Sequence, residues 1–292
     1  MKELGSTLRN KWNKRFCAAF TNDIREEKII SFSSNMPSFK IVYSRQLEEW
    51  QQNPLRKSYT APSCFFCKGH DEYHYLEEVA RFAHLRIWYM VKFAAPCHFL
   101  IGDPTDHRED VSKNDVLVLQ EMAKETGLSF FGNFRDSGAS YPQHIHYQSL
   151  EIVFPIIRSS VETCFVVNEV EITKLRYPIL AFRLSSRTDN GIRVIAQAIP
   201  ELPKPYNLLF CGNEIFIVPR TKSVPSNTGG FKFAAAEVAG CIFARSKESY
   251  DFFNCQTIID ALNEVCLTCG CQEARLFEEE LAELLISKEV SK

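Results

Sequence analysis

"SGASYPQHIHYQSLEIV", residues 137 to 153, places two histidines and a glutamine at every second position. In an extended strand, side chains two residues apart share one face and lie about 6.5 Å from each other. A strand is therefore predicted here, with His144, His146 and Gln148 on one face and Ile145 on the other. A face with two histidines and an amide packs poorly into a core, so it either lines a functional site or is solvated at a sheet edge.

The whole chain has the composition of an ordinary soluble protein. It holds 292 residues, of which 45% are hydrophobic and 24% charged, enough for one large domain or two of ordinary size. The formal net charge is −2, so no broad basic field is available for a nucleic-acid backbone. Nucleic acid is therefore not expected as a partner, and any phosphate binding must be local.

The first residues, MKELGSTLRNKWNKRF, carry charges throughout and lack the apolar core of a secretory signal. No apolar run approaches the roughly 18 residues that a membrane span needs. We therefore expect a cytoplasmic protein without membrane association. In that compartment the 11 cysteines are interpreted as reduced thiols or metal ligands, not as disulfides.

The hydrophobic pattern predicts many strands and few helices. The clearest helix covers residues 112–127, because Ser112 can cap it, Asp115 completes a capping box and Gly127 suits its end. Residues 272–290 form a second, amphipathic helix. Strands are predicted within 28–44, 87–103 (broken at Pro96), 128–134, 164–172, 177–185, 192–199 and 203–220.

These elements predict an α+β fold in which an antiparallel sheet is accompanied by helices. Residues 231–244 are read as a strand or the start of a buried helix. The strand pattern partly restarts after Pro155, which favours an extension over residues 1–30, a first half over 31–158 and a second half over 159–292.

Cys64 and Cys67 form a C-x-x-C pair in a predicted loop, and both thiolates of such a pair can reach one zinc ion. Tetrahedral zinc needs two more ligands, which His107 and His144 can supply. A closed site with four protein ligands is structural. A redox pair, or two ordinary cysteines beside a surface histidine, is the alternative.

A second cysteine group, Cys266, Cys269 and Cys271, has no histidine nearby. We interpret it as buried or incidental thiols in preference to a second metal site. The remaining histidines are interpreted as structural or surface residues: His70, His74, His84 and His98.

With His144 on a metal, His146 is left as a free imidazole on the same face. A neutral imidazole can attack phosphorus and form a covalent phosphoramidate, which divides one difficult transfer into two easier steps. Gln148, one strand step further, can donate its amide N–H to a phosphoryl oxygen.

The segment before this strand is suited to phosphate. Ser137, Gly138 and Ser140 can offer backbone N–H groups and hydroxyls. Asn133 and Arg135 lie just upstream, and Arg135 is either a phosphate-binding fork or a solvated loop charge. The chain has no G-x-x-x-x-G-K-[ST] loop and no G-x-G-x-x-G fingerprint.

These residues resemble the histidine-triad superfamily, in particular its galactose-1-phosphate-uridylyltransferase-like branch, which carries H-x-H-x-Q, here HIHYQ at 144–148. The resemblance implies two histidine-triad-like halves in one chain. It also implies structural zinc on Cys64, Cys67, His107 and His144, a nucleophile at His146, and phosphoryl contact by Gln148. Asn133 stands where the branch has an active-site asparagine, eleven residues before the motif.

Three departures separate this chain from that branch. Ile145 replaces the usual proline, no histidine follows His146, and Ser140 lies one residue further from the motif than usual. Without a histidine after His146, the second metal site of some uridylyltransferases cannot be built from histidines, which disfavours true uridylyl exchange between sugars.

The downstream segments 206–223 and 234–248 look like the C-terminal part of diadenosine tetraphosphate phosphorylases and nucleotide-sugar phosphorylases. This resemblance favours inorganic phosphate as the acceptor. Arg220 and Lys222 are then candidate contacts for the distal phosphates, or else an ordinary basic loop.

The resulting expectation is a nucleotidyltransferase that splits a nucleotide-sugar or a dinucleoside polyphosphate with phosphate and forms a nucleotidyl-histidine intermediate. Sugar-phosphate exchange, a hydrolase that uses water, a non-catalytic nucleotide-binding module and a zinc-stabilised nucleic-acid-binding protein are the alternatives. A homodimer is compatible with the resemblance.

Overall fold

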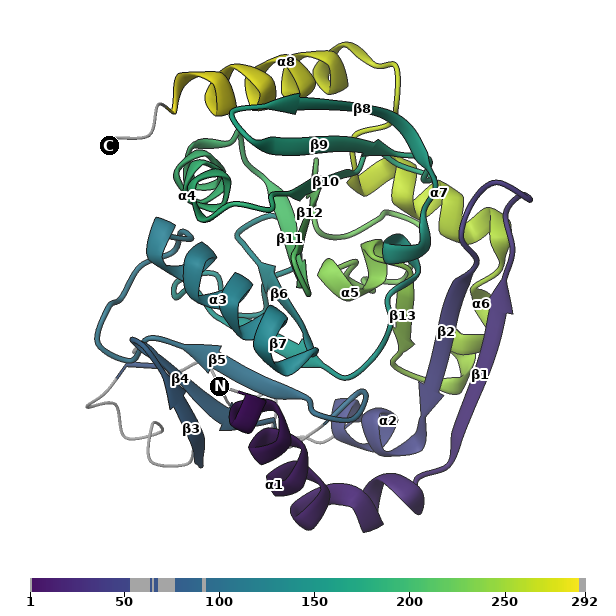
Figure 1. Ribbon diagram of the computed structural model, residues 1–292. Helices are drawn as coiled ribbons and strands as arrows, with labels where there is room; N and C mark the ends of the chain where they lie inside the picture. The colour runs from purple at the N-terminus through teal and green to yellow at the C-terminus, as the bar shows by residue number, and fades with distance from the viewer. Residues whose placement is uncertain (1, 53–63, 65, 68–76, 91–92, 289–292) are drawn as a thin grey trace.

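The computed structural model describes residues 2–52, 64, 66–67, 77–90 and 93–288 (Figure 1). Its centre is a ten-stranded sheet in which every pairing is antiparallel. In sheet order the strands are β3 (Glu78–Phe82), β4 (Leu85–Tyr89), β5 (Phe99–Gly102), β7 (Tyr147–Leu150), β6 (Ser129–Asn133), β11 (Tyr206–Cys211), β12 (Glu214–Pro219), β10 (Phe182–Ser185), β9 (Val170–Leu175) and β8 (Val161–Val167). The predicted α+β class with a large antiparallel sheet is confirmed.

The sheet is built from one pattern used twice. The order β3-β4-β5-β7-β6 is mirrored by β11-β12-β10-β9-β8, so that β8 to β12 repeat β3 to β7 along the chain. The two copies meet at β6 and β11, where Asn133 lies opposite Asn207. Both copies therefore belong to one continuous sheet, as the predicted two-half organisation requires.

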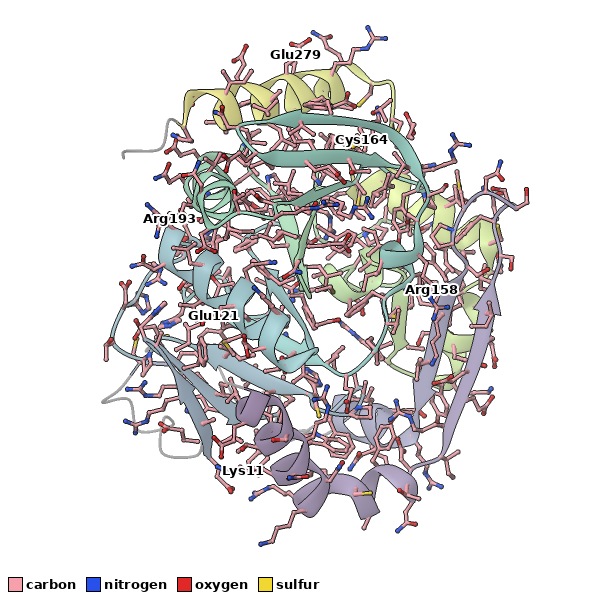
Figure 2. All side chains as sticks on the ribbon, viewed as in Figure 1. Lys11, Glu121, Arg158, Cys164, Arg193 and Glu279 are labelled. Carbon is pink, nitrogen blue, oxygen red and sulfur yellow. The ribbon has the colours of Figure 1, made fainter. Side chains whose placement is uncertain are left out.

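Four helices cover one face of the sheet (Figure 1): α1 (Lys2–Thr21), α3 (Lys113–Thr126), α4 (Asp189–Ala198) and α8 (Gln272–Ser287). In β12, Ile215 and Ile217 join the core under these helices, while Phe216 and Val218 join the core on the other side. Both faces of the central strands are thus buried, which explains their nearly continuous apolar sequence. Glu121, Arg193 and Glu279 mark the solvent-facing sides of α3, α4 and α8 (Figure 2).

The opposite face is covered by a small sheet and short helices. The small sheet consists of β1 (Arg25–Ile30), β2 (Phe39–Ser44) and β13 (Cys241–Ala244). The other elements on this face are α2 (Arg45–Gln52), α5 (Ala235–Val238), α6 (Lys247–Phe252), α7 (Cys255–Val265) and the 3-10 turn η3 (Pro155–Arg158). A further 3-10 turn, η4 (Ile199–Glu201), follows α4 and packs on the helix side of the sheet.

Strand β2 runs parallel to β13, about 200 positions later in the chain, with Ile41 opposite Ile242. The buried Phe39 and Ile41 anchor it in the same core as α5 and α7. An N-terminal segment therefore packs against the second half. The limits 1–30, 31–158 and 159–292 stay predictions, because the halves share one sheet and β2 lies across them.

Local signals located helix α3 correctly. Ser112 and Asp115 form a reciprocal capping box at the start of α3, and Gly127 ends it in the left-handed conformation at φ +67°. The amphipathic C-terminal helix is also present as α8, with Phe277, Leu281 and Leu285 buried.

The strand predicted over residues 192–199 is wrong, since this segment belongs to helix α4. Thr188 caps the helix by accepting a hydrogen bond from the backbone of Gly191. Val194, Ile195 and Ala198 are buried, at the spacing of one helical face. Packing against α3 and α8 overrides the strand preference of the β-branched residues.

The histidine strand is shorter than predicted, because β7 begins at Tyr147. His144 and His146 therefore lie in the segment that leads into the strand, and Gln148 lies within it. The backbone N–H of Ile145 bonds the carbonyl of Arg108 at 2.6 Å, which holds this segment in place. None of the described helices combines the length and apolar character needed to cross a membrane.

Candidate functional site

Four side chains that were predicted to bind metal lie together. The ligand atoms of Cys64, Cys67, His107 and His144 all lie within 4.8 Å of one another. The Cys67 Sγ lies 3.0 Å from the His107 Nδ1, and the His144 Nδ1 lies 3.3 Å from the Cys64 Sγ. Ligands around tetrahedral zinc are separated by about 3.6 Å, given Zn–S and Zn–N bonds of ~2.3 and ~2.1 Å.

The protonation states in this cluster suit a metal. His144 Nε2 faces the carbonyl of Asp103 at 3.0 Å, so it carries the proton and leaves the Nδ1 lone pair directed at the thiols. Burial and then the neighbouring His107 lower the pKa of His144 to about 4, which keeps the imidazole neutral. Burial and the adjacent Cys64 raise the pKa of Cys67 to about 11, so a bound cation is needed to stabilise the thiolate.

His146 is buried beside the cluster, and its ring is fixed on two sides. Its Nδ1 donates to the carbonyl of His144 at 3.0 Å, which leaves the lone pair on Nε2. The ring of Phe66 stacks on the imidazole with centroids 4.6 Å apart. Burial lowers the pKa of His146, so the neutral imidazole is the stable form. A neutral ring with a free Nε2 lone pair has the state that a nitrogen nucleophile requires.

Gln148 and His98 form a pair that the sequence did not reveal. His98 was interpreted as structural or surface, but it is buried and its Nε2 lies 2.8 Å from the Gln148 Oε1. Leu100, two residues after His98, lies opposite Gln148 across β5 and β7.

Three other histidines were interpreted as structural or surface residues. His84 has a structural role, since its Nε2 lies 2.7 Å from the Asp115 Oδ1, and His70 and His74 lie outside the described residues.

Gln148 opens into a cavity of about 130 Å³ that both halves of the chain line. The predicted residues Asn133, Gly138 and Ser140 line it as well. The second half contributes residues that the sequence reasoning missed, among them Lys232, Glu237 and Arg245.

The cavity is assembled by direct contact between the halves. The Asn133 Oδ1 accepts hydrogen bonds from the backbone of Ala235 at 2.7 Å and from the Asn207 side chain at 3.2 Å. Gly138 has φ +98°, and a Cβ there would lie 2.6 Å from the Cα of Ala234. Gly138 thus permits the close approach of its loop to the start of α5.

Two other loop residues do not face the cavity. Ser137 is fully buried. Its hydroxyl accepts a hydrogen bond from the backbone N–H of Phe134 and donates one to the carbonyl of the same residue. Arg135 lies on the surface and forms an ion pair with Glu109 at 2.6 Å. Their geometry is that of a turn-stabilising hydroxyl and a solvated loop charge.

Arg220 has the geometry of a structural residue, and its contact with the distal phosphates stays a prediction. Its guanidinium is buried and donates to the side chain of Asn207 and to the backbone carbonyls of Ser137, Lys222, Phe233 and Val265. Because each guanidinium nitrogen already has a protein acceptor, no N–H is directed at a distal phosphate. Lys222 is half-exposed and pairs with Glu264, which matches the alternative of an ordinary basic loop.

The second cysteine group has separate roles. Cys266 is buried in the core, while the Cys271 Sγ accepts from the Ala274 backbone at 3.3 Å and caps α8. Cys269 is exposed. The interpretation as buried or incidental thiols agrees with these positions.

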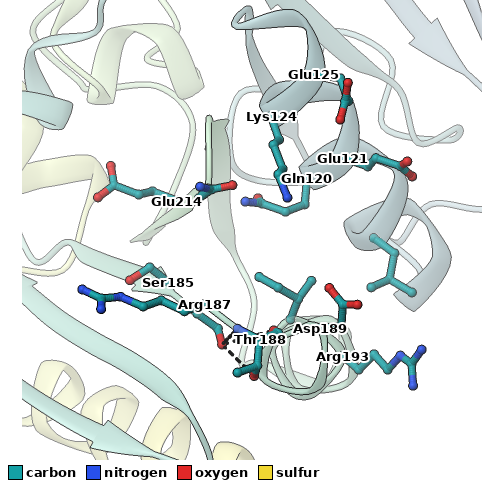
Figure 3. A pocket seen from close by; sticks show the side chains of 14 residues that line it. Gln120, Glu121, Lys124, Glu125, Ser185, Arg187, Thr188, Asp189, Arg193 and Glu214 are labelled. Carbon is teal, nitrogen blue, oxygen red and sulfur yellow. Dashed lines mark hydrogen bonds between the residues drawn. The ribbon is translucent and has the colours of Figure 1, made fainter. Parts of the chain in front are cut away.

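A larger hollow, of about 770 Å³, lies on the helix-covered side of the sheet (Figure 3). Gln120 and Lys124 of α3 face it from one side, and Thr188 and Asp189 at the start of α4 from the other. None of the predicted site residues lines it. The cavity beside Gln148 is therefore the candidate active site, although it is smaller.

Comparisons with known proteins agree with this architecture. The family model of the ATP adenylyltransferase C-terminal domain matches residues 157–268, less than half of the chain. No curated protein matches the sequence. The crystal structure of yeast Ap4A phosphorylase Apa2 is similar with a TM-score of 0.64 and 14% identity, over 92% of this chain and 98% of that chain.

The Apa2 complex with Ap4A gives a TM-score of 0.58 at 14% identity, over 89% of this chain and 97% of that chain. An ADP-glucose phosphorylase from Arabidopsis thaliana with bound ADP-glucose covers 91% of this chain and 100% of that chain, at 12% identity and a TM-score of 0.40. The likeness to Apa2 supports the predicted fold class, a large antiparallel sheet accompanied by helices.

Proposed function

We propose that this chain is a nucleotidyltransferase that uses His146 as its nucleophile and inorganic phosphate as its acceptor. One observation carries the proposal. Gln148, two residues after the buried His146, lines a cavity where amide side chains of the first half meet cations of the second half, Lys232 and Arg245. Amide donors and cations around one cavity suit a phosphate chain, whose charge must be stabilised during transfer.

In the first step, the Nε2 of His146 attacks the α-phosphorus of the substrate. The P–N bond forms while the P–O bond to the leaving phosphate breaks, and the leaving oxygen keeps the electron pair. In the second step, an oxygen of inorganic phosphate attacks the same phosphorus, and the P–N electrons return to the imidazole. Gln148 donates an N–H to the transferred phosphoryl group in both steps.

The cavity admits only part of such a substrate. Typical ligand sites measure roughly 300 to 1,000 Å³, while this cavity measures about 130 Å³. We assign it to the phosphoryl groups beside Gln148. The substrate class is a nucleotide-sugar or a dinucleoside polyphosphate, which the likeness to the Ap4A phosphorylase fold supports.

Zinc is the metal that best suits the four-ligand cluster, because two thiolates and two imidazoles are its usual structural ligands. Cys64, Cys67, His107 and His144 would hold it, and the ion would supply stability rather than a catalytic position. The two cysteines belong to the Phe66 loop and His144 leads to His146, so the cluster joins the segments on both sides of the nucleophile.

The test is a substrate panel of ADP-, GDP- and UDP-sugars and diadenosine tetraphosphate, each with and without phosphate. We expect phosphate-dependent release of a nucleoside diphosphate, or ATP and ADP from the dinucleotide, and none with His146→Ala. Mass spectrometry of a single-turnover reaction without phosphate should find one nucleotidyl group on His146. Turnover that His146→Ala retains, or a folded wild-type protein inactive on every substrate, would contradict the proposal.

A further inference from the structure

The ring of His98 is held in one tautomer. His98 precedes β5 and is 7% exposed. Its Nδ1 lies 3.0 Å from the backbone nitrogen of Ala94. A backbone N–H only donates, so Nδ1 must present its lone pair and the ring proton must sit on Nε2. The backbone of Ala94 thereby determines which nitrogen of His98 is a donor.

That donor in turn fixes the amide of Gln148. The Nε2–H of His98 points at the Gln148 side chain over 2.8 Å, so the amide atom facing it must be the oxygen. The amide nitrogen of Gln148 has no hydrogen-bond partner in the part of the chain that the structure describes. Gln148 lines the cavity, so its two N–H groups are the ones left for a ligand there.

Burial keeps this arrangement in one charge state. It lowers the pKa of His98 to about 4, and the hydrogen bond with Gln148 opposes it only in part. A neutral imidazole has one donor and one acceptor, and both are used here. A second proton on Nδ1 would point at the backbone N–H of Ala94, and two donors facing each other cannot form a hydrogen bond.

The turn that carries Ala94 is itself tied to β7 and its end. The carbonyl of Pro96 accepts from the backbone of Glu151 at 2.8 Å, and that of Cys97 accepts from the Ser149 hydroxyl at 2.9 Å. The carbonyl of Ala94 accepts from Arg25. His98 therefore links a turn anchored on both sides to the side chain of Gln148.

We propose that His98 is a positioning residue that holds the amide of Gln148 with its N–H groups toward the phosphoryl-binding cavity. This inference rests on the proposed function. Without His98, the amide can rotate and present its oxygen, which repels a phosphoryl oxygen and supplies no hydrogen bond. His98 also lines this cavity, and the role assigned to it here is exerted through Gln148.

Three substitutions separate the two hydrogen bonds of His98. In His98→Asn, the Oδ1 replaces the Nδ1 and keeps the bond from Ala94, but nothing reaches Gln148. In His98→Gln, the Nε2 keeps the donor to Gln148 and the Ala94 acceptor is lost. His98→Phe fills the same space and keeps neither bond. The melting temperature of each variant reports whether it is folded.

We expect kcat to fall by about 10- to 100-fold in His98→Asn and His98→Phe, with KM within about twofold, because a small misplacement of a catalytic group has effects of this size. His98→Gln should retain kcat within about threefold. In a Gln148→Ala background, His98→Asn should cause no further loss. Folded His98→Asn with wild-type kcat, or the same loss with and without Gln148, would overturn the inference.

A second measurement does not depend on turnover. Nitrogen-15 NMR of the imidazoles should find the His98 proton on Nε2, and His98→Asn should shift the side-chain amide signal of Gln148. A proton on Nδ1, or an unchanged amide signal, would overturn the positioning role. A wild-type protein with the expected signals but no activity on the panel would instead count against the proposed function.

Discussion

The two halves of the sheet are built alike and equipped differently. All seven histidines of the chain lie in the first half, and β7 there carries Gln148 two residues after His146. In the second half β12 is the strand that corresponds to β7, and its residues from Ile215 to Pro219 are buried. The duplicated strand pattern thus provides one scaffold twice, while the candidate chemistry is present once.

The second half still reaches the site, but through a different element. Lys232 and Arg245, on either side of α5, line the cavity from segments that follow the repeated strands. The comparison teaches that a repeated half without histidines can still supply charged side chains to a cavity of the other half. Each prediction below pairs a change in one half with a matched change or control.

The largest effect is expected for the nucleophile. His146→Ala should reduce kcat on the order of 10⁴-fold, since removal of a covalent nucleophile leaves only the residual effect of binding. Asn213→Ala, in the exposed turn that precedes β12, should leave kcat unchanged. Steady-state kinetics on the active member of the substrate panel measures both. A comparable loss of kcat in both variants would contradict the assignment of the nucleophile to the first half.

Next in size is the metal cluster. Cys67→Ser should release the metal and lower Tm by about 10 °C or more, because the binding free energy of a structural metal stabilises the fold and each kcal/mol lost lowers the Tm of a chain of this size by ~2 to 4 °C. Cys269→Ser, at the exposed cysteine of the second half, should change neither. Calorimetry and atomic absorption test this prediction. Metal bound in stoichiometric amount to Cys67→Ser would rule out the assigned ligands.

A smaller loss is expected at the junction of the halves. Arg220→Met should cost about 3 kcal/mol of unfolding free energy, because several buried carbonyls lose a charged donor. Lys222→Ala, which removes a half-exposed ion pair, should cost about 1 kcal/mol or less. Denaturant unfolding compares the two. An Arg220 variant of unchanged stability, with a raised KM for phosphate, would restore the phosphate contact first expected.

The smallest expected effect is a change in how the free energy of unfolding falls at low pH. Burial alone would raise the pKa of Asp115, but hydrogen bonds from Arg108 and His84 outweigh it and leave the pKa below its ordinary value. The unfolded chain therefore binds the proton first. The stability from Asp115 is complete above the ordinary aspartate pKa of ~3.9 and is lost as pH falls through the lower folded value.

This acid dependence should be weaker in Asp115→Asn and unchanged in Asp189→Asn, at the exposed start of the matching helix α4. Unfolding free energies measured from pH 6 down to acid give the comparison. An unaltered slope in Asp115→Asn would contradict the assigned network.

Features encoded within a few residues were predictable. The cap and end of α3 follow from Ser112, Asp115 and Gly127, because capping hydrogen bonds join neighbours in the chain. The C-x-x-C spacing indicated one metal-binding pair, and the structure places His107 and His144 beside it. Predictions failed where partners were distant, since the apolar run at 192–199 folds as a helix once it packs on α3 and α8.

The sequence by itself determined the kinds of chemistry available: a sulfur and imidazole cluster, an unligated histidine and an amide in one short motif. Only the tertiary structure decided which groups meet. It buried Arg220 among carbonyls, brought Lys232 and Arg245 to the cavity, and set His98 against Gln148. The physical reason is that hydrogen bonds and burial depend on distance in space, which strand pairing and core packing set over long separations in the chain.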